Sequence, residues 1–438
     1  SPDQVNTLPP MERVCVVGQT TLNKKRYFEI ANVVKQRFPD SVIEETICSA
    51  TDERQEEVLI LAGEVEAVVV VGGKNSANTN HLAHLSSSTG TPTFHIEKED
   101  ELDEKAISAF NSVGVTAGAS TPTWMINRVV DRLEKMGRSR SNKASRFISA
   151  VTDFTVNSNL YISTGAALLS FITPAICGFA LNPLSPFVSF FYFFSMYSLN
   201  QLGDREEFGL KKPGRIHFFE EYKGFMLSSG FASMFLALLL SSLLGTIPFL
   251  IVLISTLLGI AYSVKIFPRI ASRKMEIRRL KDIPASKDLF VGIAWAAVTV
   301  LVPAFSFAGS KLTIPVAVTF CFVFMISYIR SVLFDIRDIQ GDRFVGRETI
   351  PIIIGLEPTK IFLLVLSGLT AICLAAMTLL GYVPAIGFFL LIPVIYTVFY
   401  LFLYHRRIIS QGILCDYVVD GTFILTGLVG IFHQSAPI

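Results

Sequence analysis

Residues 313–347 read TIPVAVTFCFVFMISYIRSVLFDIRDIQGDRFVGR, an apolar run that ends in a cluster of acids and arginines. A run of this length with so few charges predicts a transmembrane helix rather than the buried helix of a soluble protein. The acids that follow it are Asp335, Asp338 and Asp342. Because their offsets are three and four, a helix carries all three on one face, at the boundary of the bilayer.

Apolar runs of similar length recur from about residue 158 almost to the end of the chain. Prolines interrupt several of them, which membrane helices tolerate when they pack against neighbouring helices. The nine predicted spans are 158–181, 186–203, 224–244, 247–264, 288–308, 313–334, 360–381, 383–404 and 415–433. The sequence therefore predicts an all-α polytopic membrane domain of nine transmembrane helices within residues 155–438.

The distribution of basic residues predicts how these helices are oriented. Alternate threading puts the loops 204–223, 265–287, 330–360 and 405–414 on one side, and together they hold twenty Lys or Arg residues. The loops on the other side hold one, Lys311. Since basic loops remain in the cytoplasm, we expect a multi-pass protein of the cell (inner) membrane whose N-terminal domain is cytoplasmic. We expect the lipid bilayer as a partner and no nucleic acid.

Residues 1–137 have the composition of a soluble domain and alternate between strands and helices. Helices between short apolar strands predict an α/β domain in which a parallel sheet is covered by helices, in three layers. The next segment, 138–154, is expected to be a basic linker. Strands are predicted at 13–17, 67–71, 93–96 and 112–115, and helices at 24–37, 53–63 and 121–136. Six cysteines without a CxxC pair or a secreted framework indicate a reduced, cytoplasm-facing protein.

Small polar residues follow the predicted strands, at the sheet edge where ligands sit in α/β folds. Hydroxyls and backbone amides at helix N-termini bind anions without needing many charges. For any one loop an ordinary helix N-cap is the better interpretation, as for Thr21, Thr51 or Thr121. Four such loops in chain order favour an anion site. They are residues 19–21, 48–51, 72–78 and 116–121.

The acids after residue 334 would repel one another unless a divalent cation joined them. Magnesium suits such a place because it binds through a few carboxylates, substrate phosphates and water. The interleaved arginines have the fork geometry that binds diphosphate oxygens in pairs. A second group, Asn200 and Asp204, stands at the end of the span 186–203, and for it alone solvated loop charge is an equal alternative. Acids at a membrane boundary favour a functional interpretation of the first cluster.

Residues 335–351, DIRDIQGDRFVGRETIP, resemble the second aspartate-rich motif of the UbiA prenyltransferase superfamily, and residues 200–204, NQLGD, resemble the first. Residues 262–265 and 287–292 resemble segments beside its fourth and fifth helices, so the resemblance covers about 155–433. It implies Mg²⁺ and the transfer of a polyprenyl group from its diphosphate to a membrane-soluble or amphiphilic acceptor. It implies Mg²⁺ ligands at Asn200, Asp204, Asp335, Asp338 and Asp342, catalytic roles for Asp204, Asp338, Lys265 and Arg343, and substrate contacts by Asn200, Arg337 and Arg347.

Residues 48–56, 71–80 and 113–122 (CSATDERQE, VGGKNSANTN and VGVTAGASTP) resemble 4-hydroxy-3-methylbut-2-enyl diphosphate reductase of the LytB/IspH family. The resemblance covers about residues 11–137 and only the C-terminal portion of that enzyme. It implies that Cys48 is one ligand of a [4Fe-4S] cluster and that an electron donor serves the complete reductase. It also implies substrate contacts by Thr20, Ser76, Asn78 and Ser120. The other cluster ligands are expected upstream of Ser1, so reductase activity is expected only with that part present.

Three functions stay open at this point. The first is a membrane prenyltransferase fused to the reductase, and the second is a longer protein that acts chiefly as the iron–sulfur reductase. The third is a catalytically decayed protein that binds prenyl diphosphates, suggested by Phe208, which stands where the superfamily usually has a third acid. A transporter suits the number of spans but not the acids and arginines. Asp416 and Asp420, one turn apart in the last span, either orient the acceptor or bond to a neighbouring helix.

Overall fold

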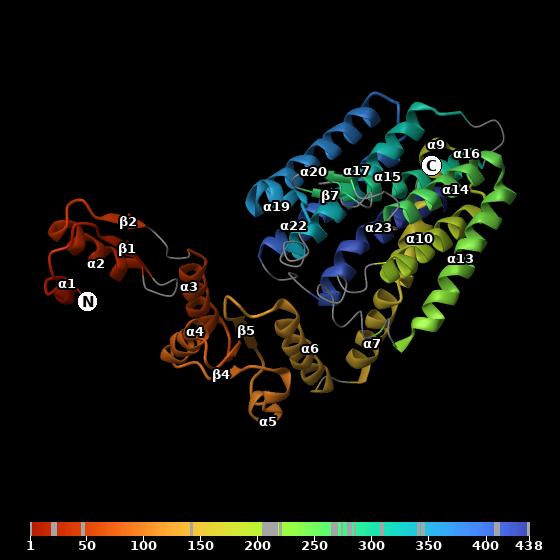
Figure 1. The fold of residues 1–438 in the computed structure, drawn as a ribbon. Coiled ribbons are helices and arrows are strands. Elements are labelled where there is room, and N and C mark those ends of the chain that lie inside the picture. The colour runs from red at the N-terminus through yellow and green to blue at the C-terminus, as the bar shows by residue number, and fades with distance from the viewer. Residues whose placement is uncertain are drawn as a thin grey trace. The chain divides into compact units, whose positions relative to one another are not determined.

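The computed structural model divides the chain into two compact units, Ser1–Asn142 and Lys143–Ile438. The boundary falls within residues 138–154, the predicted linker. Figure 1 shows the elements of both units along the chain. The residues that the structure describes are 2–18, 24–44, 49–140, 143–203, 218, 221–263, 270–272, 275–277, 283, 286–306, 311–339, 342, 347–406 and 412–435.

The first unit contains two small parallel sheets. In one, β1 (Cys15–Val17) pairs with β2 (Val42–Glu44), and in the other β3 (Ala67–Val71) lies between β4 (Thr93–Ile96) and β5 (Val113–Ala117). All five residues of β3 are buried, as expected for the central strand of a parallel sheet covered on both faces. The predicted parallel α/β arrangement is therefore confirmed, while β2, only three residues long, was not predicted.

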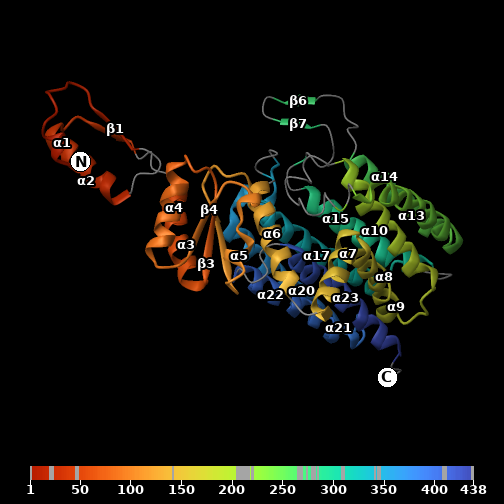
Figure 2. The same ribbon diagram turned by 90° about the horizontal axis from the view of Figure 1, so that it is seen from below.

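Helices cover both faces of the three-stranded sheet. Val68 and Val70 pack in one cluster with Leu82 of α4, whereas Val69 and Val71 pack in another with Val129 of α6. Successive side chains of a strand point to opposite faces, which explains this division. The strands and helices of this unit are drawn in Figure 2. The helices of this unit are α1 (Pro2–Val5), α2 (Lys24–Arg37), α3 (Ser49–Glu64), α4 (Ala77–Ser88), the 3-10 helix η1 (Glu99–Glu101), α5 (Glu104–Ile107) and α6 (Thr123–Arg140).

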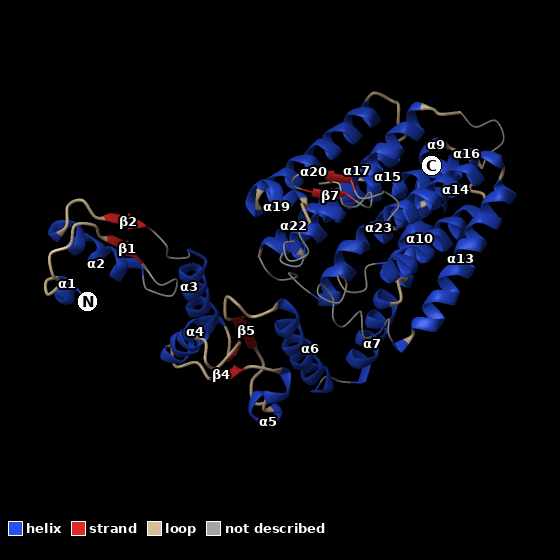
Figure 3. Ribbon diagram, viewed as in Figure 1, coloured by secondary structure: helices blue, strands red, loops and turns tan. Residues whose placement is uncertain are grey.

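The second unit is a bundle of helices (Figure 3), many of them apolar. It begins with α7 (Lys143–Asn157), so most of the segment predicted as a linker is helical. The helices that follow are α8 (Leu160–Leu169), α9 (Ile172–Cys177), α10 (Leu184–Gly203), α13 (Lys223–Leu244), α14 (Thr246–Ser263), α15 (Ser286–Ala296), the π-helix η3 (Ala297–Leu301), α16 (Val302–Phe305), α17 (Ile314–Arg337), α19 (Ile350–Ile354), α20 (Leu356–Leu379), α21 (Ile386–Phe389), α22 (Leu391–His405) and α23 (Gly412–Ser435). A short antiparallel pair, β6 (Ile270–Ser272) and β7 (Met275–Ile277), lies between α14 and α15.

Seven stretches of the described chain are long and apolar enough to cross a membrane, and each coincides with a predicted span. They are Leu160–Cys177, Lys223–Leu244, Ser286–Phe305, Ile314–Arg337, Leu356–Leu379, Ile386–His405 and Ile413–Gln434. Of the other two predicted spans, 247–264 forms the shorter apolar helix Thr246–Tyr262, and 186–203 forms α10. Seven of the nine predicted spans are thus candidate membrane helices within the described residues, and the count of nine stays a prediction.

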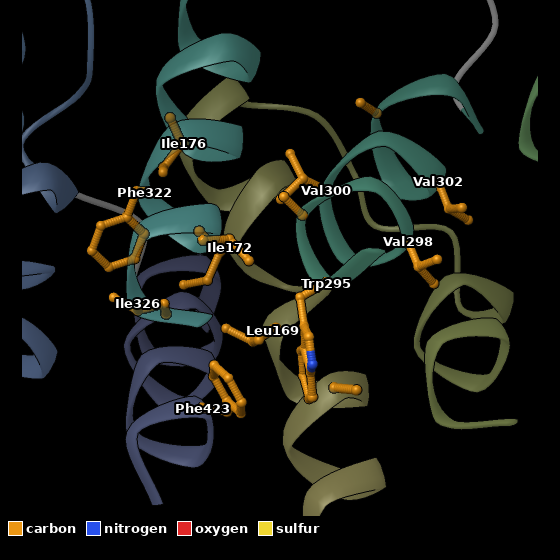
Figure 4. Packing of buried hydrophobic residues seen from close by; sticks show 14 of the residues in the cluster. Leu169, Ile172, Ile176, Trp295, Val298, Val300, Val302, Phe322, Ile326 and Phe423 are labelled. Atoms are coloured by element: carbon orange, nitrogen blue, oxygen red, sulfur yellow. The ribbon is translucent and has the colours of Figure 1, made fainter. Parts of the chain in front are cut away.

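The centre of the bundle is an aromatic stack around Trp295 of α15. The Trp295 ring stacks on Phe193 of α10, with ring centroids 3.9 Å apart, and on Phe423 of α23, 4.1 Å away. Figure 4 shows Trp295 and Phe423 among the aliphatic side chains that fill the space between the helices. Stacked aromatic pairs contribute about 0.5–1.5 kcal/mol beyond the area that they bury, so this stack ties three helices together.

The outer surface of the bundle is apolar as well. Along α20, Ile361, Val365, Leu369 and Ile372 are all more than half exposed. These side chains cost little in hydrocarbon, where a helix also satisfies its own backbone hydrogen bonds. The exposed apolar helices therefore support a membrane protein.

Candidate functional site

A lysine and two aspartates meet where α15 begins and α17 ends. Lys287 and Asp288 lie in the first turn of α15, and Asp335 lies in the last turn of α17, which packs against α15. Lys287 Nζ forms an ion pair with Asp335 Oδ1. The negative end of the α17 dipole disfavours a carboxylate at its C-terminus, and the lysine offsets this. Asp288 and Asp335 both have a relative exposure of 0%.

Arg337 forms a second cluster at the end of α17. Its Nε donates to Asp338 Oδ1 at 2.9 Å, and its Nη1 donates to Asp416 of α23. The guanidinium also lies over the Phe334 ring, 4.4 Å from the centroid. The Arg337 side chain is buried and shared between two carboxylates, so the substrate contact expected of it remains a prediction.

A third cluster lies two turns earlier along the same face of α17. Arg330 donates from Nε to Asp420 of α23 and from Nη1 to the Tyr197 hydroxyl at 3.2 Å. Phe334 lies between the two arginines, since Arg330 contacts the same ring at 4.7 Å. The pairs Arg330–Asp420 and Arg337–Asp416 therefore join α17 to α23. This agrees with the interpretation that the two aspartates of the last span bond to a neighbouring helix.

The three acids of the second motif have different neighbours in the structure. Asp335 pairs with Lys287 and Asp338 with Arg337, while Asp342 is buried and acts electrostatically on Lys287 and Asp288. Backbone bonds from Asp338 N to Phe334 O and from Asp342 N to Asp338 O, both 2.9 Å, keep helical spacing at these residues. Within the ranges described, the structure brings together no group of three His, Cys, Asp or Glu side chains suited to a metal ion.

A magnesium ion nevertheless needs few protein ligands, because it retains water and takes phosphate oxygens. Asp335 Oδ2 is buried and has no hydrogen-bond partner among the described residues. A buried carboxylate oxygen left in this way costs free energy, which a cation recovers. The donor set at the end of α17 thus fits a hard divalent cation.

The remaining residues predicted for the membrane site are placed only in part. Asn200 lies in the last turn of α10, half-buried. Arg347 lies within the second motif, near enough to Tyr262 to act on it electrostatically. Asp204, Lys265 and Arg343 lie outside the described residues. All of these assignments stay predictions.

Two functional candidates, Asp288 and Arg330, were not singled out from the sequence. The available signal was an ionisable residue within an apolar span, which favours a functional role even without a motif. Arg330 stands inside the run 313–334, and Asp288 begins the run 288–308. The partners of both residues are on other helices, which the sequence alone did not indicate.

In the first unit, the expected substrate-binding residues follow β3 and β5 at one edge of the sheet. Ser76 is the N-cap of α4, and its hydroxyl accepts from Thr79 N at 3.4 Å. Asn78 is buried, and neither atom of its amide group has a hydrogen-bond partner in the described part of the chain. Ser120 follows β5 and is exposed. Thr20 and Cys48 lie outside the described residues, so a cluster site is not tested by the structure.

The loops that carry these residues approach each other through glycines. Gly72 has φ +145°, and a Cβ built on Gly118 would lie 2.2 Å from Thr79 Oγ1. Thr121 Oγ1 donates to Val71 O at 3.0 Å, which fixes the loop after β5 against the end of β3. Nearby, Lys74 pairs with Glu101, and this hydrogen bond raises the pKa of Lys74 above its ordinary value. The lysine therefore stays protonated at neutral pH.

Gly118→Ala is expected to lower the opening free energy of this sheet by about 1–3 kcal/mol, because the added methyl group overlaps Thr79. Hydrogen exchange of peptides from β3 and β5, measured by mass spectrometry on the whole chain, checks this. The control is Gly63→Ala in α3, where a Cβ meets no atom within 4 Å. Equal protection of Gly118→Ala and wild-type strands would refute the close approach.

A family model described as "UbiA prenyltransferase family" matches residues 188–412, just over half of the chain. The chain belongs to the UbiA prenyltransferase family. A second model, "LytB protein", matches residues 1–134, so this UbiA chain carries a LytB-type domain before its membrane unit. Both resemblances inferred from the sequence are therefore confirmed.

Curated relatives of the first unit are 4-hydroxy-3-methylbut-2-enyl diphosphate reductases. The protein from Clostridioides difficile is 42% identical over 140 residues, which is 30% of this UbiA chain and 50% of the relative. That from Opitutus terrae is 41% identical over 133 residues, 30% of this chain and 46% of the relative. The chain spans about half the length of these curated relatives.

Solved structures resemble each unit of the UbiA chain. A UbiA homologue from Archaeoglobus fulgidus bound to GPP and Mg²⁺ is 16% identical, with 64% of this chain and 99% of that one covered and a TM-score of 0.47. A structure of (E)-4-hydroxy-3-methyl-but-2-enyl diphosphate reductase is 39% identical, covering 28% of this chain and 44% of that one, with a TM-score of 0.25.

Proposed function

We propose that the membrane unit transfers a polyprenyl group from its diphosphate to a membrane-soluble or amphiphilic acceptor, with Mg²⁺ as the required ion. The observation that carries this proposal is the buried Lys287–Asp335 pair, whose Asp335 retains an oxygen without a partner among the described residues. This pair lies within the region that matches the UbiA family. A buried carboxylate beside a lysine is costly in a membrane helix and is typical of a functional site.

The residues at the end of α17 would hold the ion and the diphosphate. Asp335 and Asp338 would be its ligands, with Asn200, Asp204 and Asp342 as the other predicted ones. When bound, Mg²⁺ supplies positive charge against the departing diphosphate. Lys265, Arg343 and Arg347 would contact the diphosphate oxygens directly.

The neighbouring contacts position these carboxylates. Lys287 fixes one oxygen of Asp335, and Arg337, itself held by Asp416, fixes Asp338. A ligand locked in this way loses little entropy when the substrate arrives. The core of the bundle around Trp295 is packed and aromatic. Exclusion of water by such a core would favour reaction of the developing allylic cation with a lipid-soluble acceptor.

Purified protein in lipid, incubated with prenyl diphosphates of several chain lengths and an acceptor extract, tests the proposal. We expect diphosphate release and a prenylated product with Mg²⁺, and neither with EDTA. Asp338→Asn is expected to lower the rate by about 10²–10³-fold, as for other groups that stabilise developing charge. Glu348→Gln, an exposed carboxylate of the same motif, serves as the control.

Donor binding without any product would instead favour the decayed, binding-only alternative. Full transfer by Asp338→Asn would show that the second motif does not hold the ion.

We further propose that the protein lies in the cell (inner) membrane with the first unit in the cytoplasm. Cysteine labelling from each side of sealed vesicles checks this orientation.

For the first unit we propose the reductase chemistry of its relatives within a longer protein. The supporting observation is Asn78, a buried amide without partners among the described residues, at the sheet edge where Ser76 and Ser120 also lie. Cys48 would be one ligand of a [4Fe-4S] cluster, which supplies electrons from an external donor when bound. The test is reduction of 4-hydroxy-3-methylbut-2-enyl diphosphate by the longer protein, compared with its Asn78→Ala variant.

A further inference from the structure

Asp288 is a buried carboxylate of the membrane unit that neither aspartate-rich motif includes. It lies in the first turn of α15, its side chain has a relative exposure of 0%, and neither carboxylate oxygen has a partner at hydrogen-bond geometry among the described residues. The Ser331 hydroxyl and the Asp335 carboxyl lie beside it. A hydroxyl gives at most one hydrogen bond, whereas a carboxylate accepts several.

The charges around Asp288 do not balance within the described cluster. Lys287 is the lysine that acts on Asp288, and its ammonium is already paired with Asp335. Asp342 adds a third buried negative charge near the same lysine, and Arg347 and Tyr262 lie at the edge of the group. Like charges buried together repel strongly, so such a cluster persists only if a proton or a cation joins them.

Neighbouring carboxylates at this junction leave oxygens without a hydrogen-bond partner among the described residues. Asp335 uses Oδ1 for Lys287 and leaves Oδ2 without a partner, while Asp288, beside it, leaves both oxygens. The two carboxylates come from different helices, α15 and α17, which pack together. Two carboxylates and water suffice for a hard divalent cation.

We propose that Asp288 is a further ligand of the divalent cation, which it shares with Asp335 across the α15–α17 junction. This inference rests on the proposed function, since the cation is the one that transfer requires. It assigns to α15 a part of the metal site that both aspartate-rich motifs leave out. The cation then joins α15 to α17 before any prenyl diphosphate binds.

The test uses the whole chain in lipid nanodiscs and Mn²⁺ alone as the probe, without prenyl donor. Free Mn²⁺ is measured by electron paramagnetic resonance, and the melting temperature is recorded with and without the ion. Asp288→Asn is expected to weaken Mn²⁺ binding about 10–100-fold. Its cation-free melting temperature should equal or exceed that of the wild type, because an unpartnered buried charge has been removed.

Asp420→Asn is the matched control, because Asp420 is also buried but forms an ion pair with Arg330. It should lower the melting temperature and leave Mn²⁺ affinity unchanged. Asp335→Asn should weaken Mn²⁺ binding as Asp288→Asn does, and the double variant should lose little more, because both carboxylates serve one ion.

Unchanged Mn²⁺ affinity in Asp288→Asn would overturn the proposal. This is the result expected if a proton shared between Asp288 and Asp335, rather than a cation, balances the charge. If Asp288→Asn does not fold, Asp288→Glu decides: altered affinity supports the assignment and wild-type affinity refutes it. Because no donor is present, the result is independent of transfer. If Asp288→Asn loses Mn²⁺ binding while the wild type has no transferase activity, only the proposed function is refuted. If the wild type transfers normally and Asp288→Asn binds Mn²⁺ as the wild type does, only this inference is refuted.

Discussion

Replacing Arg330 by Met destabilises the helical unit by about 3–5 kcal/mol, because it leaves the Asp420 carboxylate buried without its cation. The arginine also contacts Tyr197, Phe334 and Phe423, so the loss includes packing. Thermal unfolding in detergent, followed by near-ultraviolet circular dichroism, measures the effect. We expect a fall in melting temperature rather than a change in helix content of the folded state.

The double variant Arg330→Met with Asp420→Leu separates the pair from its surroundings. Apolar replacement of a whole buried ion pair is often neutral or stabilising, so most of the lost stability should return. Lys360→Met is the control, because Lys360 pairs with Glu357 on an exposed part of α20. A single Arg330→Met variant as stable as wild type would show that the pair does not join α17 to α23.

Replacing Lys287 by Met destabilises the cation-free protein about as much as replacing Arg330 does. The same replacement is expected to strengthen cation binding. Without the lysine, Asp288 and Asp335 are two buried carboxylates with no balancing ammonium, which costs about 3–5 kcal/mol. The same change removes a positive charge that competes with the cation. We therefore expect a lower melting temperature without metal, recovery with Mn²⁺, and tighter Mn²⁺ binding than in the wild type.

Lys311→Met, an exposed lysine in another part of the unit, should change neither property. Lys287→Arg, which keeps the charge, should retain most of the stability without metal. Weaker Mn²⁺ binding in Lys287→Met would contradict the account, since it would mean that the lysine helps to assemble the ion site rather than to balance it.

Local patterns of sequence predicted the elements well. The apolar runs became helices because bilayer thickness sets both their length and their composition. The strands 67–71 and 93–96 and the helix 24–37 have the bounds that the sequence predicts. Basic residues predict a linker at 138–154, which contains the boundary between the two units and most of α7, with Phe147, Ile148 and Val151 at helical spacing.

Sequence patterns do not predict which charged side chains pair across different helices. Lys287 and Asp335 are 48 residues apart, and Arg330 and Asp420 are 90 apart. Spacing along one helix predicts that the acids of the second motif share a face. It does not predict that Asp335 pairs with Lys287 and Asp338 with Arg337. The motif predicts a substrate contact for Arg337, but it gives no sign of the bonds to Asp338 and Asp416 that the structure shows.

The central claim is that the carboxylates at the end of α17 hold a divalent cation that also binds the prenyl diphosphate. Electron–nuclear double resonance on the whole chain, loaded with Mn²⁺ and a non-hydrolysable prenyl diphosphate analogue, tests it most directly. We predict a ³¹P coupling that shows direct bonding of the ion to diphosphate, lost in Asp338→Asn and kept in Glu348→Gln. Bound Mn²⁺ without ³¹P coupling, or a coupling that survives in Asp338→Asn, would contradict the account.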